Sequence, residues 1–518
     1  MSTTERKSKS GTIETIQSLV VAFVLAMVFR GFVVEGFVIP TGSMAPTLLG
    51  QHLLMHSDQT GEDFAVGFGA RRSTSTDRFS DPLLGRSMPL SIAEAKKIQP
   101  RTGDRVVVLK TLFPFFDPER FDVVVFKNPT DTQGPSANYI KRLIGLPGET
   151  LWIADGDIFA KNGDEPFAIQ RKPEHVQRSL WRQVSDSDAV PTDTLALSRA
   201  WRGSPWDARP RTHWTFQNRT WVCNTAQPST LTWDQNNILI DDWLPYNMLM
   251  PTVRQEPMAD IRVSATITPD EDTLTAGFTL EAMGLRYVWT LTEGTIDLVL
   301  STKTGEVLQS VKTPFLGAKA GEALRVECWH VDQMMAIYVN GERLAELLYD
   351  FGPEQRLRLA TGSNSSVPIE DLAGRGQKAA KLAWQFDGSP LTMTRVQVDH
   401  DLYYRSSRLP SRAVKNPTAP GNEELVEVGS PAFGTHPDKL AVLGEDQFMM
   451  AGDNSAYSLD GRLWGNPDAF VSAQFDDSPF VVHRDLLIGK AWSVYWPATN
   501  KIGSLSVIPD FGRIRFIR

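Results

Sequence analysis

A continuous apolar run near the N-terminus dominates the hydrophobic pattern of this chain. Residues 19–29 are all apolar, and mostly uncharged neighbours extend the segment to residues 13–35. A helix needs about 20 such residues to cross a bilayer. Basic residues within positions 6–9 precede the run, which places residues 1–12 in the cytoplasm and the remainder outside. The pattern predicts a single transmembrane helix over 13–35.

A cleavable secretory signal has a similar charged start and apolar centre. Such a signal ends in a small-x-small cleavage site, whereas this run is followed by Arg30-Gly-Phe-Val-Val-Glu35. The uncleaved anchor is therefore the favoured interpretation.

Short apolar runs separated by turn residues make up most of the remaining chain. Residues 103–109, 122–126 and 139–144 read as β-strands, and many similar runs occupy residues 213–404. Asn340-Gly341, between two of these runs, is a strong hairpin signal. Residues 165–212 are rich in charge, Trp and Pro, and are interpreted as irregular connection. We expect a mainly β protein.

One lysine lies within such a strand. By strand alternation, Lys141 shares a face with Tyr139 and Leu143, while Arg142 shares the other face with Ile140. Apolar neighbours can desolvate an ammonium group and lower its pKa toward neutrality. A lysine in that state can take the proton of a serine hydroxyl.

Composition narrows the function classes further. The chain has 518 residues and a net charge of −8, which argues against nucleic acid as a partner. Eight histidines and two cysteines show no metal-ligand spacing, so no metal and no cofactor are expected. Cys223 and Cys328 leave two alternatives open, a disulfide or two separate buried thiols.

Several segments, in this order, resemble type I (leader) signal peptidases, which are serine–lysine proteases. After the apolar run come Ser43-Met-Ala-Pro-Thr47, Gly103–Val108 and Val124–Lys127. Tyr139-Ile-Lys-Arg-Leu-Ile-Gly-Leu-Pro-Gly-Glu149 matches the lysine box of the family almost letter for letter. Gly452-Asp-Asn454 with Ser458-Leu-Asp-Gly-Arg462, and then Ile488–Ala491, match its last segments.

The resemblance implies a role for each matched residue. Ser43 would be the nucleophile and Lys141 its general base. Thr41 and Ser43 itself would donate to the oxyanion, and Ser458, preferred over Ser455, would orient the lysine. The ion pairs that support this arrangement would involve Asp453, Asp460, Arg462 and Arg142.

The resemblance also implies the substrate. Secretory preproteins would pair as an extended strand with Gly36, Phe37, Val38 and Ile39 on one side and Asn138, Tyr139 and Ile140 on the other. Cleavage would follow an Ala-x-Ala-like sequence. Membrane lipid would be a second partner, and the catalytic part would face the outside of the inner or plasma membrane.

Departures from the family define the expected domains. The catalytic part would comprise residues 36–155, with an insertion at 51–102, and residues 422–518. Between them, residues 156–421 would form an inserted domain with a β-sandwich at about 213–404. Residues 329–343 of this sandwich resemble laminin-G or concanavalin-like sandwiches, so glycan binding, protein binding and simple packing are all open.

Two rival functions remain to be compared with the peptidase. A self-cleaving repressor would carry a DNA-binding head, which this chain lacks. A catalytically silent membrane-bound protein, whose sandwich binds glycan or protein, would not need Ser43, Lys141 and Ser458 together. The peptidase is the favoured interpretation.

Overall fold

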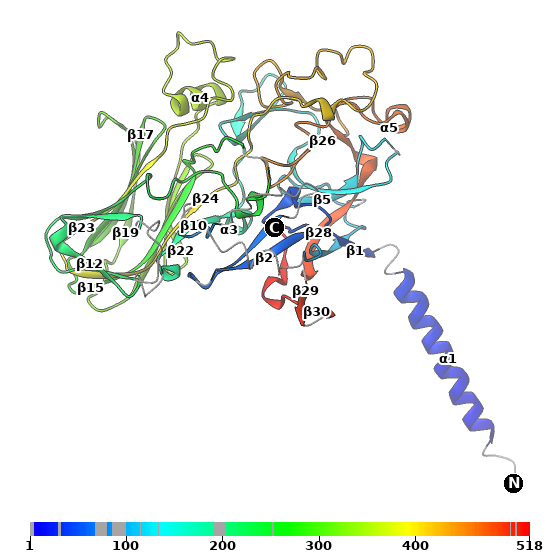
Figure 1. Cartoon of the computed structure of the whole chain (residues 1–518), viewed down its shortest axis with the longest axis horizontal. Coiled ribbons are helices and arrows are strands. Elements are labelled where there is room, and N and C mark those ends of the chain that lie inside the picture. Colours follow the sequence, from blue (N-terminus) through cyan, green and yellow to red (C-terminus); the bar gives the residue numbers. More distant parts are fainter. Residues whose placement is uncertain are drawn as a thin grey trace.

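The computed structural model describes residues 5–28, 33–57, 59–67, 80–84, 100–113, 115–132, 134–190, 203–250, 253–497, 499–502 and 505–518. Strands predominate over helices throughout these ranges, so the prediction of a mainly β protein is confirmed. Two β-rich parts lie side by side in Figure 1, and helix α1 extends away from one of them.

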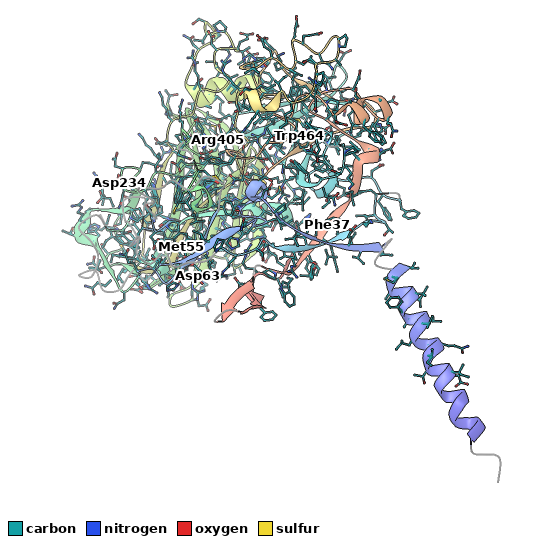
Figure 2. All side chains as sticks on the ribbon, turned by 45° about the vertical axis from the view of Figure 1, so that its right-hand side comes forward. Phe37, Met55, Asp63, Asp234, Arg405 and Trp464 are labelled. Atoms are coloured by element: carbon teal, nitrogen blue, oxygen red, sulfur yellow. The ribbon has the colours of Figure 1, made fainter. Side chains whose placement is uncertain are left out.

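Helix α1 covers Glu5–Val28 rather than residues 13–35. Among the described residues no helix combines the length and the apolar character that a membrane crossing requires. Residues 29–32 of the predicted transmembrane helix lie outside the described residues. The apolar side chains of α1 are nevertheless exposed, with Leu19 at 69% and Phe23 at 62%. Figure 2 shows these side chains projecting from a helix that stands apart from the packed body.

An eight-stranded antiparallel sheet carries the sequence boxes described above. Its strands follow the order β1-β4-β28-β5-β6-β26-β27, with β31 paired to β28. The first four in chain order are β1 (Val34–Val38), β4 (Arg105–Leu109), β5 (Val123–Lys127) and β6 (Asn138–Gly145). The others are β26 (Gln447–Ala451), β27 (Val482–His483), β28 (Leu487–Trp496) and β31 (Arg515–Phe516). The sheet therefore joins segments from both ends of the chain.

Three smaller sheets flank this one. The four-stranded sheet has the order β25-β7-β8-β9 and contains β7 (Glu149–Ala154), β8 (Asp157–Asn162), β9 (Ala168–Ile169) and β25 (Ala441–Val442). Two hairpins are β2 (His52–His56) with β3 (Asp63–Gly67) and β29 (Thr499–Ile502) with β30 (Leu505–Pro509). The hairpin β2–β3 lies within the segment interpreted as the 51–102 insertion.

The middle of the chain folds into two large facing sheets. One contains β10 (Arg182–Asp186), β12 (Trp214–Gln217), β13 (Thr220–Cys223), β15 (Ile261–Pro269), β20 (Leu324–Val331), β21 (Met334–Val339), β22 (Glu342–Leu348) and β24 (Leu391–His400). The other contains β11 (Trp206–Arg209), β14 (Ser229–Trp233), β16 (Thr275–Ala282), β17 (Leu285–Thr292), β18 (Gly294–Thr302), β19 (Val307–Phe315) and β23 (Lys381–Asp387).

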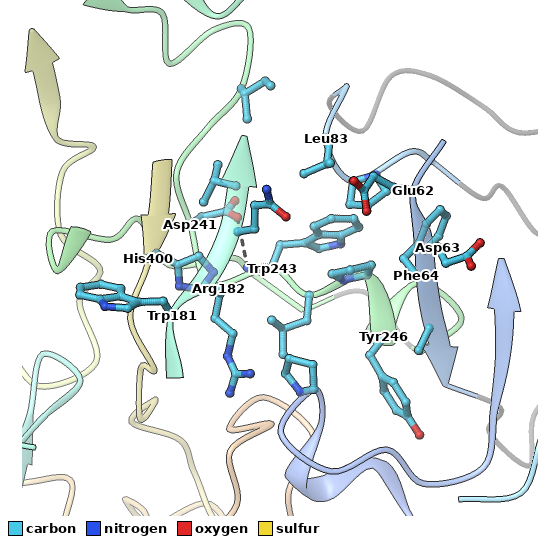
Figure 3. Close-up of a pocket in the computed structure, with 18 of the residues that line it drawn as sticks. Glu62, Asp63, Phe64, Leu83, Trp181, Arg182, Asp241, Trp243, Tyr246 and His400 are labelled. Carbon is cyan, nitrogen blue, oxygen red and sulfur yellow. Dashed lines mark hydrogen bonds between the residues drawn. The ribbon is translucent and has the colours of Figure 1, made fainter. Parts of the chain in front are cut away.

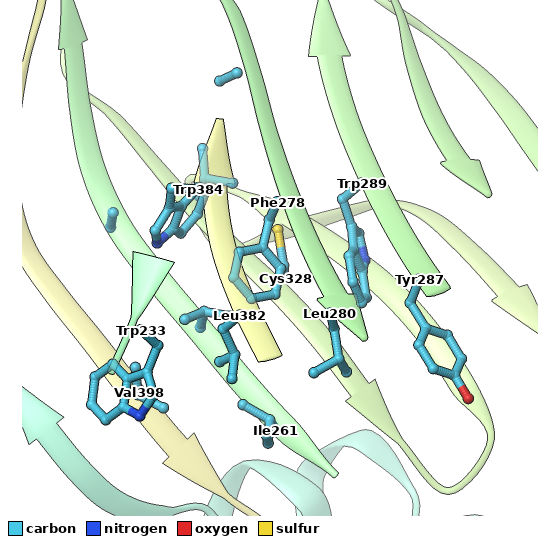
Figure 4. Packing of buried hydrophobic residues seen from close by; sticks show 14 of the residues in the cluster. Trp233, Ile261, Phe278, Leu280, Tyr287, Trp289, Cys328, Leu382, Trp384 and Val398 are labelled. Carbon is cyan, nitrogen blue, oxygen red and sulfur yellow. The ribbon is translucent and has the colours of Figure 1, made fainter. Parts of the chain in front are cut away.

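One hydrophobic core joins the two facing sheets. Trp289 and Trp384 from one sheet and Val398 and Cys328 from the other are all at most 1% exposed. Figure 4 shows these side chains filling the space between the strands. Burial of large aromatic side chains makes this core the main source of stability for the sandwich.

One sequence interpretation needs correction here, and one open alternative is decided. Residues 165–212 are not entirely irregular, because α3 (Glu174–Leu180), β10 and β11 lie within them. The sandwich therefore begins before residue 213. Cys223 and Cys328 are both buried free thiols, so the alternative without a disulfide holds.

Short helices complete the fold. The remaining α-helices are α4 (Pro353–Thr361) and α5 (Ala469–Gln474). The 3-10 helices are η2 (Gly42–Met44), η3 (Ser187–Ala189), η5 (Arg211–His213), η6 (Pro245–Asn247), η7 (Ser411–Ala413), η8 (Arg484–Leu486) and η9 (Phe511–Arg513).

Candidate active site

Ser43 and Lys141 lie in contact. Ser43 is in the short helix η2, directly after edge strand β1, and Lys141 is in β6. Lys141 Nζ donates a hydrogen bond of 2.6 Å to Ser43 Oγ. Met44 anchors the serine from the next position, since it is fully buried in a cluster with Val106 and Ile140. The two residues are thus held at the distance that proton transfer requires.

Lys141 is in a desolvated environment. Its side chain is buried beside the ring of Tyr139, with Nζ 5.5 Å from the ring centroid. Besides Ser43, the one acceptor of Nζ within the described part of the chain is the carbonyl of Ile140, at 3.1 Å. Burial lowers the pKa of Lys141 to about 8, against the opposing effect of the Asp460 and Asp453 carboxylates. Part of the Lys141 population therefore carries a neutral amine near physiological pH.

Arg142, the neighbour of Lys141, makes a fully buried ion pair. Its guanidinium donates to both carboxylate oxygens of Asp453, at 2.8 and 2.7 Å. Arg142 also donates to the carbonyls of Phe121 and Arg518. Burial opposes ionisation of Asp453, but Arg142 holds the pKa of that carboxyl below its usual value. The pair joins the lysine strand to the loop after β26.

The same loop contains a second buried ion pair. Arg462 donates to both oxygens of Asp460, at 2.9 and 2.8 Å. Asp460 also accepts from the backbone N–H of Gly452, at 2.9 Å. Ser455 Oγ accepts from Arg462, at 2.7 Å. These contacts join residues within the loop after β26, and none of them involves Ser43.

Ser458 was expected to orient the lysine, but the two residues are not hydrogen-bonded here. The Ser458 hydroxyl is buried and does not contact Lys141; it lies beside the Asp460 carboxylate, whose pKa it helps to lower. It packs against Gly452, where a Cβ atom would lie only 2.2 Å from Ser458 Oγ and 2.5 Å from the carbonyl oxygen of Ser43. Gly452 thus allows the loop and the serine to approach closely.

Thr41, the expected oxyanion donor, precedes η2. Its side chain is exposed and makes no capping hydrogen bond to this helix. The Thr41 side chain is therefore accessible to solvent.

Both strands expected to bind substrate have open edges among the described residues. β1, which contains Gly36, Phe37 and Val38, pairs only with β4 and forms one end of the sheet. β6 pairs with β5 over residues 138–142, but with β26 only at residues 142, 143 and 145. Asn138 and Tyr139 therefore have no strand partner on the side of β26 among the described residues, and the Ile140 carbonyl there accepts from Lys141 Nζ. Ile39 follows β1 and donates to the Asp104 carbonyl.

Asn454 is a site residue to which the sequence assigned no role. Its side chain donates to the carbonyl of Gly42, at 3.0 Å, and its backbone N–H donates to the carbonyl of Ser43, at 3.0 Å. Two adjacent carbonyls of the serine turn are thus held by one residue. Its place in the Gly452-Asp-Asn454 box was the available signal.

Helix η6, from the middle of the chain, also contacts the serine turn. Asn247 exchanges two amide hydrogen bonds with Asn454, at 2.9 and 2.8 Å. Tyr246 packs on Gly42, where a Cβ atom would lie 2.0 Å from Tyr246 Cε1. The Tyr246 hydroxyl donates to the carbonyl of Gln51, at 3.1 Å. No sequence motif marks these two residues.

A second contact from the middle of the chain reaches the same turn. Arg182, in β10, donates to Thr47 Oγ1 at 3.3 Å, and Thr47 donates to Asp453 at 2.6 Å. The segment after Ser43 is therefore linked both to the Arg142–Asp453 pair and to the sandwich.

Several buried carboxylates lie apart from this site. Asp157, Asp260 and Asp332 lie close enough to share a cation. Arg356 Nε lies 3.1 Å from Asp155 and 3.3 Å from Asp157, and Lys172 Nζ lies 2.5 Å from Asp332 and 2.8 Å from Asp401. These two side chains already supply positive charge, and the expectation of no metal stays a prediction.

Comparisons with known proteins agree with the sequence boxes. Residues 12–228 match the model of the family described as signal peptidase, peptidase S26. A signal peptidase I of Pseudomonas aeruginosa is 31% identical over 156 residues, which cover 28% of this chain and 39% of the relative. One from Leptolyngbya laminosa is 28% identical over 209 residues, covering 39% of this chain and 72% of the relative.

The alignment thus spans less than half the length of the Pseudomonas relative. Among solved structures, the carbohydrate-binding module CBM66 from Bacillus subtilis aligns with a TM-score of 0.23 and 8% identity, covering 38% of this chain and 96% of the module.

Proposed function

We propose, on the premise that this chain belongs to the signal peptidase family S26, that it is a serine endopeptidase that removes signal peptides from exported preproteins. The observation that carries the proposal is the 2.6 Å contact between Ser43 Oγ and a buried lysine. A serine needs an adjacent base to become a nucleophile, and no other titratable side chain is hydrogen-bonded to Ser43 Oγ among the described residues.

The first half of the reaction uses the neutral form of Lys141. Its Nζ accepts the proton of Ser43 Oγ, which attacks the scissile carbonyl. The backbone N–H of Ser43 and the hydroxyl of Thr41 donate to the resulting oxyanion. Collapse of the tetrahedral intermediate releases the mature N-terminus, which takes the proton from Lys141, and leaves the signal peptide as an acyl group on Ser43.

Hydrolysis then completes the cycle. Lys141 takes a proton from water, the water oxygen attacks the acyl carbonyl, and the proton returns to Ser43 Oγ. The Arg142–Asp453 pair holds the lysine strand against the loop after β26, and Asn454 holds the serine turn. Ser458, in the same loop, is assigned the role of orienting Lys141.

The substrate binds as a strand between β1 and the first half of β6. Gly36–Ile39 and Asn138–Lys141 supply the backbone edges, and small residues at the first and third positions before the cut fit this close approach. Support comes from the unpaired edges of both strands next to Ser43.

Membrane attachment through α1 is also part of the proposal. The exposed apolar side chains of this helix, such as Leu19 and Phe23, favour contact with lipid. We place the N-terminus in the cytoplasm and the catalytic part outside the inner or plasma membrane. Deleting residues 1–33 should release the protein from alkali-washed membranes, and unchanged membrane recovery would contradict this point.

Cleavage of a preprotein with an Ala-x-Ala end, in detergent, tests the proposed activity. We expect wild type to cut after the second Ala, and Ser43→Ala and Lys141→Ala to be inactive. Lys312→Ala, a change at an exposed residue of the sandwich edge strand β19, serves as a matched lysine control with wild-type activity. An inert wild type, or an active Lys141→Ala variant, would overturn the mechanism.

A further inference from the structure

A cavity of about 700 Å³ lies behind the serine turn, and the proposed reaction does not use it. Pro46 and Leu49, shortly after Ser43, form part of its wall. The remaining wall comes from the hairpin β2–β3, the sandwich strand β10, the segment that leads into η6, and the C-terminal segment. A volume of this size matches that of sites that bind small molecules.

Arg182 supplies an unpaired positive charge to this cavity. Its side chain is only 7% exposed, and among the described residues its one hydrogen bond is the 3.3 Å contact with the Thr47 hydroxyl. Within the described part of the chain no carboxylate lies at ion-pair distance from it, since the nearby Asp453 is already held by both nitrogens of Arg142. Figure 3 shows the guanidinium extending from β10 toward the N-terminal segment.

A buried guanidinium without an anion is unfavourable, because burial removes its hydration. The same cause lowers the pKa of Arg182 to about 10. Most of its five N–H donors have no protein acceptor, so the side chain can offer a bidentate pair to an anion.

Two further arginines line the same end of the cavity. Arg515 donates to the carbonyl of Thr47, the residue whose hydroxyl accepts from Arg182. Arg513 also lines the cavity but is paired with Asp104, at 3.0 Å. Arg182 and Arg515 therefore converge on one residue from two distant parts of the chain, and neither has a carboxylate partner among the described residues.

The opposite walls are aromatic. Phe64, Trp243 and Tyr246 line the cavity together with aliphatic side chains. In Figure 3 Trp243 lies between Arg182 and the β3 side, where Phe64 is flanked by the acidic Glu62 and Asp63. The cavity thus has two arginines at Thr47 and an aromatic wall at Trp243 and Tyr246. Four carboxylates also belong to its lining, those of Glu62, Asp63, Asp241 and Asp510.

We propose that this cavity is a binding site for a small organic anion. The carboxylate or phosphate of the ligand contacts Arg182 and Arg515, and its apolar body packs against Trp243 and Tyr246. Tyr246 also packs on Gly42, the residue before Ser43. A ligand in the cavity would therefore contact a side chain that supports the serine turn. The site is distinct from Ser43 and Lys141, and its occupancy can be measured without any cleavage reaction.

Calorimetric titration of the full chain in a non-ionic detergent tests the proposal. The probes are 2-naphthoate, 2-naphthyl phosphate and the uncharged 2-naphthamide. We expect at least one charged probe to bind wild type about tenfold more tightly than the amide, because only it forms charge-assisted hydrogen bonds. The stronger of the two anions identifies the headgroup. Equal binding of all three probes, or no binding of either anion at millimolar concentration, would overturn the proposal.

Variants locate the site. Arg182→Gln should remove the preference for the charged probe, whereas Lys312→Gln, on β19, should keep wild-type binding. Arg515→Gln is the second test in case the first variant misfolds, since Arg515 is exposed and donates to a single carbonyl. Near-ultraviolet circular dichroism checks the fold of each variant. A folded Arg182→Gln or Arg515→Gln variant with an undiminished preference for the anion would contradict the assignment.

Discussion

Asn247 and Asn454 exchange two amide hydrogen bonds across 207 positions of sequence. Asn454 in turn holds the carbonyls of Gly42 and Ser43. A residue from the middle of the chain therefore contacts the residue that holds the serine turn.

Asn247→Ala should lower kcat about tenfold and leave KM unchanged. The variant frees the Asn454 amide, so the serine turn loses part of its orientation while the strand edges that bind substrate stay intact. Steady-state cleavage of the Ala-x-Ala preprotein measures both constants. Asn364→Ala, at an exposed position after α4, is the matched control. A rise in KM with kcat unchanged would assign Asn247 to substrate binding instead.

Gly42→Ala should reduce cleavage by about 100-fold, because the new methyl group would overlap the Tyr246 ring and displace the serine turn. Adding Tyr246→Ala should restore part of the activity by making space. The comparison variant is Gly277→Ala, whose methyl group would meet no atom closer than 3.4 Å. Equal activity of the single and double variants would show that the ring does not position this turn.

The cleavage rate should rise with pH and level off above an apparent pKa of about 8. Burial lowers the pKa of Lys141 to this value, and only the neutral amine accepts the serine proton. At pH 7, one unit below that pKa, about 10% of the lysine is neutral. The measurement is kcat/KM between pH 6 and 9.5. A flat profile, or a rate that falls over this range, would contradict Lys141 as the base.

Arg356→Met should destabilise the fold by about 3–5 kcal/mol. Arg356 is 2% exposed and lies between Asp155, Asp157 and Asp260, so its loss leaves buried carboxylates without a counter-charge. Urea denaturation followed by tryptophan fluorescence gives the difference. Lys312, which is 74% exposed and 3.6 Å from the partly buried Asp297, supplies the control, Lys312→Met, with a change below about 1 kcal/mol. Similar losses in both variants would mean that Arg356 is not needed for charge balance.

Local sequence pattern was sufficient to predict the part of the site formed by Ser43 and Lys141. Strand alternation placed Lys141 beside Tyr139, and the structure has Nζ 5.5 Å from that ring. The family-like segments around Ser43 and Lys141 predicted that these two side chains lie together, and they are hydrogen-bonded. Both predictions rest on short-range regularities or on a family pattern that covers only those segments.

The contacts of Tyr246, Asn247 and Arg182 with the serine turn join residues far apart in the sequence, and local pattern does not predict such contacts. Tyr246 and Asn247 lie in Leu244-Pro-Tyr-Asn-Met248, a stretch without a motif, and their partners lie far away in the chain. Arg182 falls in a stretch interpreted as irregular, yet it is part of β10. The N-terminal helix was predicted too far downstream, since apolar content alone set its limits and the charged residues before position 13 also became helical.

Thr47 and Asp453 are hydrogen-bonded but lie 406 positions apart in the sequence, which affects folding during synthesis. Ser43 and Lys141 are synthesised early. The sandwich strands follow, and only then are β26, the loop after it and β28 synthesised. Until then β6 lacks β26, Arg142 lacks its carboxylate, and the serine turn lacks Asn454. Because domains fold largely as they emerge, the nascent chain carries a nucleophile that cannot yet be aligned. Alignment of the nucleophile is thus postponed until the segment beyond the sandwich has been made.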